Sequence, residues 1–200
     1  SGKFDAEITP FTVKTRRGEV LCDKDEQPGK GNKEKIPQLR PAFKKDGSVT
    51  AANSSSISDG AAALVLTRLS VAKELDLKPI ARVAKYTSNS QEPEWFTTAP
   101  VGAIRKLLKN LNWSKDDVDL YEINEAFAAV TMAVMKEIDL PHEKVNIHGG
   151  ACALGHPIGA SGARIIVTLL SAMQAYDKQK GVAAICIGGG EALSVALELI

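Results

Sequence analysis

The chain has 200 residues, of which 44% are hydrophobic, so it is long and apolar enough to bury a sizeable core. Its 25 basic and 24 acidic side chains nearly cancel, which argues against nucleic acid, and no apolar run approaches the roughly 18 residues of a membrane span. Three cysteines are too few for a disulfide framework. We therefore expect a soluble protein of a reducing compartment, and predict a cytoplasmic location.

The composition of residues 1–50 predicts a polar segment at the surface rather than part of the core. Short strands are expected at 7–13 and 19–21, and the polar run 23–35 is typical of a surface loop. The serines at 54–56 are typical of a turn. Apolar runs are few in this region, and four prolines interrupt it: Pro10, Pro28, Pro37 and Pro41.

The next part of the chain predicts more regular structure. The apolar run 61–66 has the length of a strand, 70–75 predicts a short helix, and a domain boundary is expected near 76–79. Residues 80–86 predict a strand, and Pro100 suits the first turn of the helix that follows. That helix has one apolar stripe, formed by Ile104, Leu107, Leu108 and Leu111.

Strands and helices then alternate to the end of the chain. Strands are predicted at 118–123, 182–187 and 193–199, and helices at 124–138 and 158–176. Apolar strands separated by helices favour a parallel sheet covered on both faces, whereas a short glycine turn makes the last two strands antiparallel. The predicted fold class is α/β, with a mixed, mostly parallel five-stranded sheet covered by helices on both faces.

Asn124 is the first candidate site residue, because it follows an apolar strand and begins the sequence NEAF. A helix N-cap would by itself explain an asparagine at this place. In open α/β sheets, however, chemistry gathers at the carboxyl ends of the strands, and Asn124 lies at such an end. Both interpretations stay open from the residues alone.

The stretch Asn146–Arg164, NIHGGACALGHPIGASGAR, concentrates glycine and histidine ahead of an apolar helix. Its glycines alternate with small apolar residues, which is typical of a loop packed into the interior rather than of a linker. Backbone N–H groups at a helix start favour a neutral imidazole, so His156 is a candidate hydrogen-bond donor to a developing oxyanion. The alternative is a hydrogen-bonded structural histidine.

Cys186 is the last polar-capable group on the apolar strand VAAICI, which precedes three glycines, Gly188 to Gly190. A buried free cysteine usually behaves as a small hydrophobic residue. The glycines let backbone N–H groups approach a ligand, and a thiol beside such a turn can exchange a proton with a substrate carbon. They are also expected to raise the thiolate fraction. Cys22 and Cys152 are interpreted as structural.

Other common motifs do not match. The glycine spacing is neither that of a dinucleotide-binding loop nor that of a nucleophile elbow, and no Walker lysine follows a glycine run. The histidines His142, His148 and His156 have no carboxylate or cysteine at ligand spacing, so no metal site is expected.

Three of these motifs together resemble the thiolases, in particular their acetyl-CoA acetyltransferase branch. GGACALGHPIGASGAR is similar to the C-terminal signature of that family, and NEAF and CIGGG match in the right order along the chain. The cysteine in CIGGG distinguishes the chain from the β-ketoacyl synthases, which share the fold but generally use a second histidine. The resemblance runs from about Phe4 to Leu199.

The resemblance implies a role for each matching residue. Asn124 would hold a water that, with His156, forms an oxyanion hole for an enolate. Cys186 would be the general acid and base, and the Gly188 N–H would serve a second oxyanion hole. The binding site for the substrate and coenzyme A would be lined by Leu39, Phe43, Ala51, Ser55, Ala126 and Phe127.

Two departures from the family pattern concern the adenine end of coenzyme A. Gly29 and Lys30 stand where many relatives have an arginine, and Ser56 stands where glycine is common. The resemblance further implies three regions: 1–52 as the end of a loop domain over coenzyme A, 53–76 as the last strand and helix of the N-terminal domain, and 77–200 as the C-terminal domain.

The implied activity is the Claisen condensation of two acetyl-CoA into acetoacetyl-CoA and coenzyme A, and its thiolytic reverse. The implied partners are these thioesters, coenzyme A, an N-terminal half and further copies in a homo-oligomer, with no separate cofactor, nucleic acid or membrane. Thiolases are about twice as long, and their nucleophilic cysteine lies in the other half, so this chain alone is expected to be inactive. A non-catalytic coenzyme A or acyl-chain binding module, or a half-subunit that pairs with a separate N-terminal chain, is the alternative hypothesis.

Overall fold

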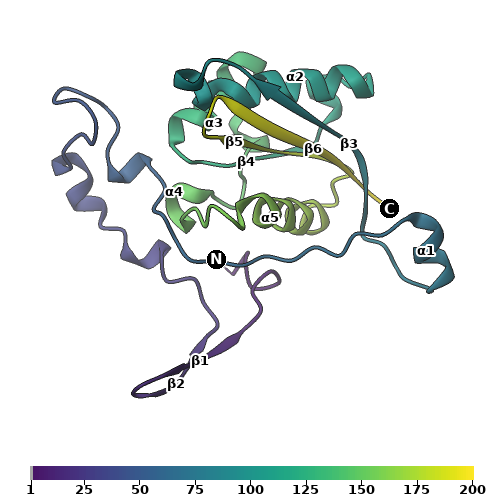
Figure 1. Cartoon of the computed structure of the whole chain (residues 1–200), viewed down its shortest axis with the longest axis horizontal. Helices are drawn as coiled ribbons and strands as arrows, with labels where there is room; N and C mark the ends of the chain where they lie inside the picture. The colour runs from purple at the N-terminus through teal and green to yellow at the C-terminus, as the bar shows by residue number, and fades with distance from the viewer. Residues whose placement is uncertain (1) are drawn as a thin grey trace.

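The computed structural model describes residues 2–200, and its centre is a four-stranded sheet with the order β3-β6-β5-β4 (Figure 1). β4 and β5 are parallel, whereas β6 is antiparallel to both β5 and β3. The predicted antiparallel pairing across the glycine turn is therefore confirmed. The four strands are β3 (Ala81–Ser90), β4 (Leu120–Ile123), β5 (Lys180–Ile187) and β6 (Glu191–Leu199).

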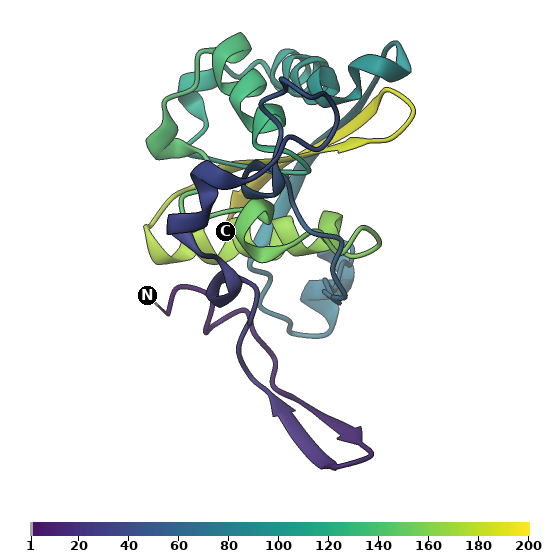
Figure 2. The same cartoon turned by 90° about the vertical axis from the view of Figure 1, so that its left-hand side faces the viewer.

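Helices cover both faces of this sheet, as predicted. α2 (Ala99–Leu111) and α3 (Ala128–Ile138) pack on one face, and α5 (Ser161–Ala175) packs on the other (Figure 2). Each helix buries one stripe of apolar side chains spaced three and four residues apart. None of the helices within residues 2–200 is both long enough and apolar enough to cross a membrane.

Alternate residues of β5 divide between the two layers of the core. Val182, Ala184 and Cys186 belong to the hydrophobic cluster on the α2 and α3 side, whereas Ala183 belongs to the cluster on the α5 side. Because neighbouring side chains of a strand point to opposite faces, β5 is buried on both sides. This burial explains why residues 182–187 of the strand are all apolar.

The N-terminal arm (residues 2–58) lies beside this core, in agreement with the polar surface segment that the sequence predicts (Figure 1). Its two expected strands form an exposed hairpin of β1 (Phe11–Thr15) and β2 (Gly18–Cys22), and the predicted loop 23–35 runs through short 3₁₀ turns. An unpaired segment follows the arm and leads to the predicted short helix, α1 (Leu69–Glu74).

The predicted five-stranded, mostly parallel sheet is wrong in strand count and in direction. Among residues 2–200 four strands form it, and β4–β5 is its one parallel pair. Residues 61–66 do not form the expected strand, because no neighbouring strand takes up their N–H and C=O groups. A single parallel bridge between Tyr121 and Val145 flanks β4 at the place of a fifth strand.

α3 begins four residues later than predicted, and the cause is the strand before it. The N–H of Asn124 donates to the carbonyl of Ala184 at 2.9 Å, so the chain continues the β4–β5 ladder beyond Ile123. The helix starts only after Phe127, which is extended and forms a bridge with Ser54. Asn124 is therefore not a helix cap.

α5 also begins later than predicted, at Ser161 instead of Ile158. The carbonyl of Pro157 accepts hydrogen bonds from the N–H groups of Ala160 and Ser161, which makes a tight turn before the helix. A short helix that the sequence did not predict, α4 (Ala151–Leu154), precedes this turn.

Leu107 and Leu69 test this placement of the core. Leu107 of α2 is fully buried, whereas Leu69 of α1 is 60% exposed. Leu107→Ala should lower the free energy of unfolding by about 2–5 kcal/mol, because it removes buried methyl groups and leaves a cavity. Leu69→Ala should change it by less than about 0.5 kcal/mol. Urea unfolding followed by circular dichroism measures both, and equal losses would contradict the arrangement.

Candidate active site

The carboxyl ends of β4 and β5 bring the predicted polar residues to one edge of the sheet. Asn124 is almost completely buried at this edge, and its side-chain Nδ2 lies 3.3 Å from Nε2 of His156. Because Asn124 pairs with Ala184, Cys186 lies two residues further along the neighbouring strand at the same edge. The structure thus pairs Asn124 with His156 and sets Cys186 beside the same end of the sheet.

Asn146 holds the end of β4 in place. Its Oδ1 accepts a hydrogen bond from the Ile123 N–H at 2.7 Å, and its Nδ2 donates to the Ile123 carbonyl at 2.8 Å. One side-chain amide therefore takes the place of a neighbouring strand for the residue before Asn124. Asn146 has a φ of 47°, a conformation in which asparagine is enriched. The sequence analysis missed this role, and an asparagine shortly before a glycine pair was the available signal.

Glu125 connects Asn146 to the glycine-rich loop. Its carboxylate accepts hydrogen bonds from Asn146 Nδ2 at 2.9 Å and from the Cys152 N–H at 3.1 Å. A Cβ on Gly150 would lie 2.3 Å from the Glu125 carboxyl carbon, so a larger residue there would displace this carboxylate from its hydrogen bonds. This position fixes the loop that leads to His156, and sequence reasoning did not identify Glu125 as part of the site.

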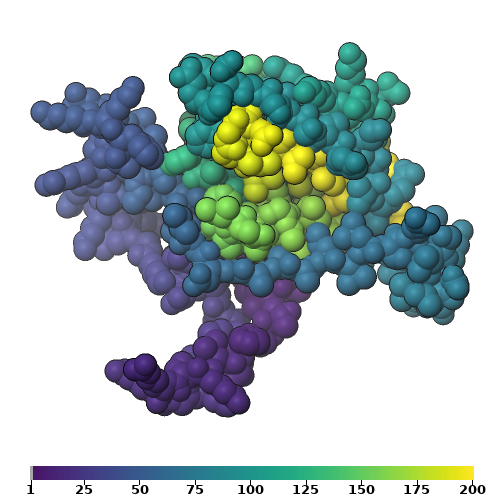
Figure 3. Space-filling view, viewed as in Figure 1, coloured from purple at the N-terminus to yellow at the C-terminus, as the bar shows by residue number. Residues whose placement is uncertain are grey.

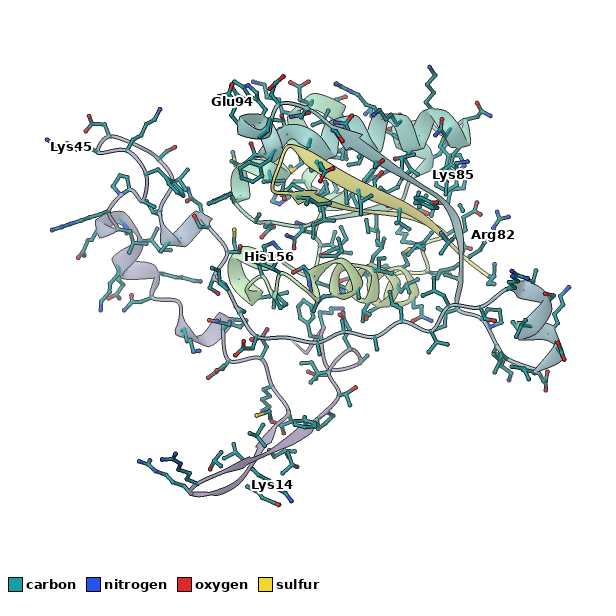
Figure 4. The ribbon with its side chains drawn as sticks, in the orientation of Figure 1. Lys14, Lys45, Arg82, Lys85, Glu94 and His156 are labelled. Carbon is teal, nitrogen blue, oxygen red and sulfur yellow. The ribbon has the colours of Figure 1, made fainter. Side chains whose placement is uncertain are left out.

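His156 lies between the arm and the start of α5 (Figure 4). The backbone N–H of His156 donates to the Ser56 carbonyl at 2.8 Å, and its ring Nδ1 lies 2.5 Å from Ser161 Oγ. Gly155, just before it, has a φ of +88°, and a Cβ there would meet Ser58 Oγ at 2.1 Å. The arm therefore contacts the histidine loop closely.

Burial, and secondarily the charge of Arg164, lower the pKa of His156, so its imidazole is neutral near pH 7. The neutral form agrees with the expectation from sequence, but the expected cause was the helix start. α5 begins only at Ser161, and desolvation has the larger effect.

Arg164 lies against the buried carboxyl group of Glu122 on the α5 side of the sheet. Its Nη1 lies 3.4 Å from Glu122 Oε1, and burial raises the pKa of Glu122 to about 8 although Arg164 opposes this shift. Glu7 of the arm lies nearby and accepts a 2.7 Å hydrogen bond from Thr168 Oγ1. Burial also raises the pKa of Glu7.

Cys186 is buried, and this burial raises the pKa of its thiol. The expected gain in thiolate is therefore wrong: the glycine turn does not outweigh the loss of water around the sulfur. The turn itself is tightly packed, since a Cβ on Gly190 would lie 2.1 Å from the Gln91 carbonyl oxygen. At Gly188, by contrast, the space around a built Cβ is open.

The other two cysteines differ from Cys186. Burial and the charge of Glu125 raise the pKa of Cys152 to about 11, and Cys22 is exposed on the hairpin. Within the described chain, no hydrogen bond links Cys186 to His156. The structure therefore brings Cys186 to the same edge as His156 without a direct bond.

The residues expected to line the substrate are brought together in part. Ser55 donates from both its N–H and its Oγ to the carbonyl of Ala126, at 3.1 and 3.0 Å. The rings of Phe43 and Phe127 meet edge to face, with their centres 6.0 Å apart. Leu39 and Ala51 are exposed on the arm and take no part in these contacts.

An open pocket of about 470 Å³ lies next to the histidine loop. One wall comes from the end of the arm and the unpaired segment after it, and the other from the turn before α5. Figure 3 shows this region and the turn between β5 and β6 on the same exposed face. The pocket is lined by Ser58, Asp59, Gly60, Ala61, Ala62, Pro157, Ile158, Gly159, Ala160 and Ala163.

Comparison with protein families gives two matches along this chain. The model for the thiolase N-terminal domain matches residues 1–70, and the model for the thiolase C-terminal domain matches residues 77–199. Among curated relatives, an acetyl-CoA acetyltransferase of Pseudomonas aeruginosa is 50% identical over 198 residues, which are 98% of this chain and 50% of the relative. A probable acetyl-CoA acyltransferase of Staphylococcus aureus is 47% identical over 199 residues, with similar coverage.

Solved structures give the same result. An acetyl-CoA acetyltransferase of Bacillus anthracis superposes with a TM-score of 0.96 at 48% identity, covering all of this chain and 51% of the other. A thiolase from Ascaris suum in complex with coenzyme A superposes with a TM-score of 0.86 at 41% identity, covering all of this chain and 50% of the other. The chain thus spans about half the length of the relatives it matches.

The raised pKa of Glu122 has a consequence for stability. Between about pH 4.5 and 8 the folded chain keeps a proton on Glu122 that the unfolded chain has lost. The free energy of unfolding should therefore fall as pH rises through this window, by at most about 1.4 kcal/mol per pH unit from this group. Glu122→Gln stays neutral and should flatten the decline in urea unfolding series.

The exposed Glu143 supplies the control, because Glu143→Gln removes a carboxylate outside the buried cluster. This variant should keep the pH dependence of the unmodified chain. Glu7 remains in both variants and leaves a residual slope of the same sign, since burial raises its pKa as well. An unchanged slope in Glu122→Gln would show that Glu122 is ionised in the folded chain throughout this range.

Proposed function

Because this chain belongs to the thiolase family, we propose that it forms the C-terminal half of an acetyl-CoA C-acetyltransferase. The reaction joins two acetyl-CoA into acetoacetyl-CoA and free coenzyme A, and runs in reverse as thiolysis. The observation that carries the proposal is the contact of Asn124 with His156, 3.3 Å apart at the carboxyl end of the sheet. A buried amide and a neutral imidazole are suited to an enolate oxygen, which needs hydrogen bonds but no permanent cation.

In the proposed first half-reaction, a cysteine thiolate from the rest of the protein attacks the thioester carbonyl of one acetyl-CoA. The bond from carbon to the sulfur of coenzyme A breaks, and that sulfur takes up a proton. Cys186 is suited to supply this proton, because burial keeps its thiol protonated. The thiolate then left on Cys186 is a stronger base for the same reason.

In the second half-reaction, this Cys186 thiolate removes a proton from the methyl carbon of the second acetyl-CoA. The negative charge moves to the thioester oxygen, where His156 and Asn124 provide hydrogen bonds. The enolate carbon attacks the acetyl group on the nucleophilic cysteine, and that cysteine leaves as a thiolate. The Gly188 N–H stabilises the tetrahedral oxygen, and each such donor is commonly worth about 3–4 kcal/mol.

The substrate side of the proposal uses the contacts between the arm and the segment 124–127. We infer that Ser55, Ala126, Phe43 and Phe127 form one wall for the pantetheine and acyl groups, with Leu39 and Ala51 further along the arm. Their mutual contacts support this wall. Coenzyme A thioesters are then substrates, and the proposal includes no separate cofactor.

We further propose that 1–52 is the end of the loop domain over coenzyme A, 53–76 the last strand and helix of the N-terminal domain, and 77–200 the C-terminal domain. The complete protein is proposed to be a cytoplasmic homo-oligomer that acts in lipid metabolism. These parts rest on resemblance to thiolases. The exposed apolar residues of the segment that follows the arm, Val65 and Leu66, support a partner surface in the complete protein.

The role of Cys186 is tested in a complete thiolase that contains this chain. Serine keeps the size of the side chain but is a much weaker proton acceptor. Cys186→Ser should leave acetylation of the nucleophilic cysteine largely possible and nearly abolish exchange of the acetyl-CoA methyl protons with deuterated water. Mass spectrometry and NMR follow the two steps separately. Loss of acetylation with surviving exchange would make Cys186 the nucleophile or its activator instead.

The 200-residue chain alone should not catalyse thiolysis. Cys152 is held protonated, Cys22 is exposed on a hairpin, and Cys186 serves as the acid and base in the proposal. The measurement is the loss of acetoacetyl-CoA in the presence of free coenzyme A, with Cys186→Ala as the control. Turnover above that control would mean that this chain holds its own nucleophile. Tight coenzyme A binding without turnover after the other half is added would favour a binding module.

A further inference from the structure

Ser161 is the side chain that meets the far side of the His156 ring. It is completely buried, and its Oγ lies 2.5 Å from His156 Nδ1 and 3.0 Å from the Pro157 carbonyl oxygen. The other ring nitrogen, Nε2, faces Asn124 at 3.3 Å. The imidazole therefore lies between a hydroxyl and an amide, and each of these groups contains both a donor and an acceptor.

Two arrangements of hydrogen bonds, which run in opposite directions, satisfy the series Ser161, His156 and Asn124. In the first, Ser161 donates to the Pro157 carbonyl and accepts from His156 Nδ1–H. Nε2 then has a free lone pair, which accepts from the Asn124 amide nitrogen. In this state His156 can take a proton from a thiol.

In the second direction, Ser161 donates to His156 Nδ1, and the ring proton is on Nε2. The Pro157 carbonyl loses little, because it also accepts backbone N–H groups of Ala160 and Ser161, each at 2.8 Å. Nε2–H then donates to Asn124 Oδ1 after rotation of the amide, or to a substrate oxygen. In this state His156 can stabilise an enolate.

A carboxylate or a backbone carbonyl at the position of Ser161 would only accept, and would fix the ring proton on Nδ1. A hydroxyl does not impose this choice. We propose that Ser161 is a positioning residue that lets neutral His156 alternate between its two tautomers. The inference rests on the proposed function for its purpose, since a thiolase histidine would need to accept a proton at one step and donate a hydrogen bond at another.

The test measures the tautomer directly and needs neither substrate nor activity. Long-range ¹H–¹⁵N NMR distinguishes protonated from unprotonated ring nitrogens, and the chain contains only three histidines. The signals of His156 are identified by their loss in His156→Gln. In the unmodified chain above the pKa of His156, we expect Nδ1 and Nε2 shifts intermediate between the two types, from fast exchange of tautomers.

Ser161→Ala should convert these intermediate shifts to one protonated and one unprotonated nitrogen, with the proton on Nε2, because an Nδ1–H would have no acceptor. Ser161→Cys keeps nearly the same volume with a much weaker hydrogen-bonding group, and serves if the alanine variant does not fold. Ser171→Ala removes another hydroxyl from α5 and should retain the intermediate shifts.

A single tautomer in the unmodified chain would overturn the proposal, as would intermediate shifts that persist in both Ser161 variants. Neither result depends on whether the complete protein is a thiolase. Conversely, failure of Cys186→Ser to separate the two half-reactions would count against the proposed function and leave the tautomer result standing.

Discussion

The bidentate hydrogen bonding of the Asn146 side chain to the backbone of Ile123 is the interaction on which the candidate site depends. β4 is short, and among residues 2–200 a single bridge lies on its outer side, so the backbone at its end needs another partner. The amide of Asn146 supplies both a donor and an acceptor in a buried place where water cannot. Without it, the Ile123 N–H would be left unpaired at a cost of about 1–3 kcal/mol, and its carbonyl would keep the 3.3 Å hydrogen bond from Thr131 Oγ1. The position of Asn124 follows from this clamp.

Polar groups buried near the site are arranged in a connected series. Asn146 contacts Glu125, Glu125 holds the backbone of Cys152, and the loop that follows carries His156 to Asn124. Asn146 and Glu125 are fixed by hydrogen bonds to the backbone of Ile123 and Cys152, so these two side chains have little freedom to reorganise. Electrostatic stabilisation of a reacting oxygen works only when the donors are fixed in this way.

The sequence predicted the elements that depend on local pattern. The helix α2, the short helix α1 and the final antiparallel pair have an apolar stripe or a glycine turn, and all three form. Features set by distant partners were not predictable in the same way. The apolar run 61–66 has strand composition, but strand formation depends on a neighbour that no periodicity reveals. Likewise, α3 starts late because Ala184, sixty residues away, extends the ladder to Asn124.

In the candidate site, too, residues in a local sequence pattern were predictable, whereas residues defined by distant contacts were not. Glycines and a histidine in one stretch identified His156, and a polar residue after a strand identified Asn124. Ser161 and Glu125 look ordinary in sequence, because their roles come from the groups that folding places against them. The thiol of Cys186 shows the opposite error: the glycines beside it suggested a larger thiolate fraction, and only the packed structure reveals the burial that raises its pKa.

The hydrogen bond from Thr168 to Glu7 joins residues 161 positions apart in the chain. Closing a loop of that length costs about 4–5 kcal/mol of chain entropy, which the few contacts of the arm must recover. The sheet and its helices have a dense core of their own, so they should form first and the arm should dock last. The same order applies in reverse. Under native conditions, the backbone amides of residues 3–8 should exchange with solvent through a local opening that leaves α5 folded. Each such opening admits water to Arg164 and Glu122, so the solvation of these two groups depends on a segment that opens locally.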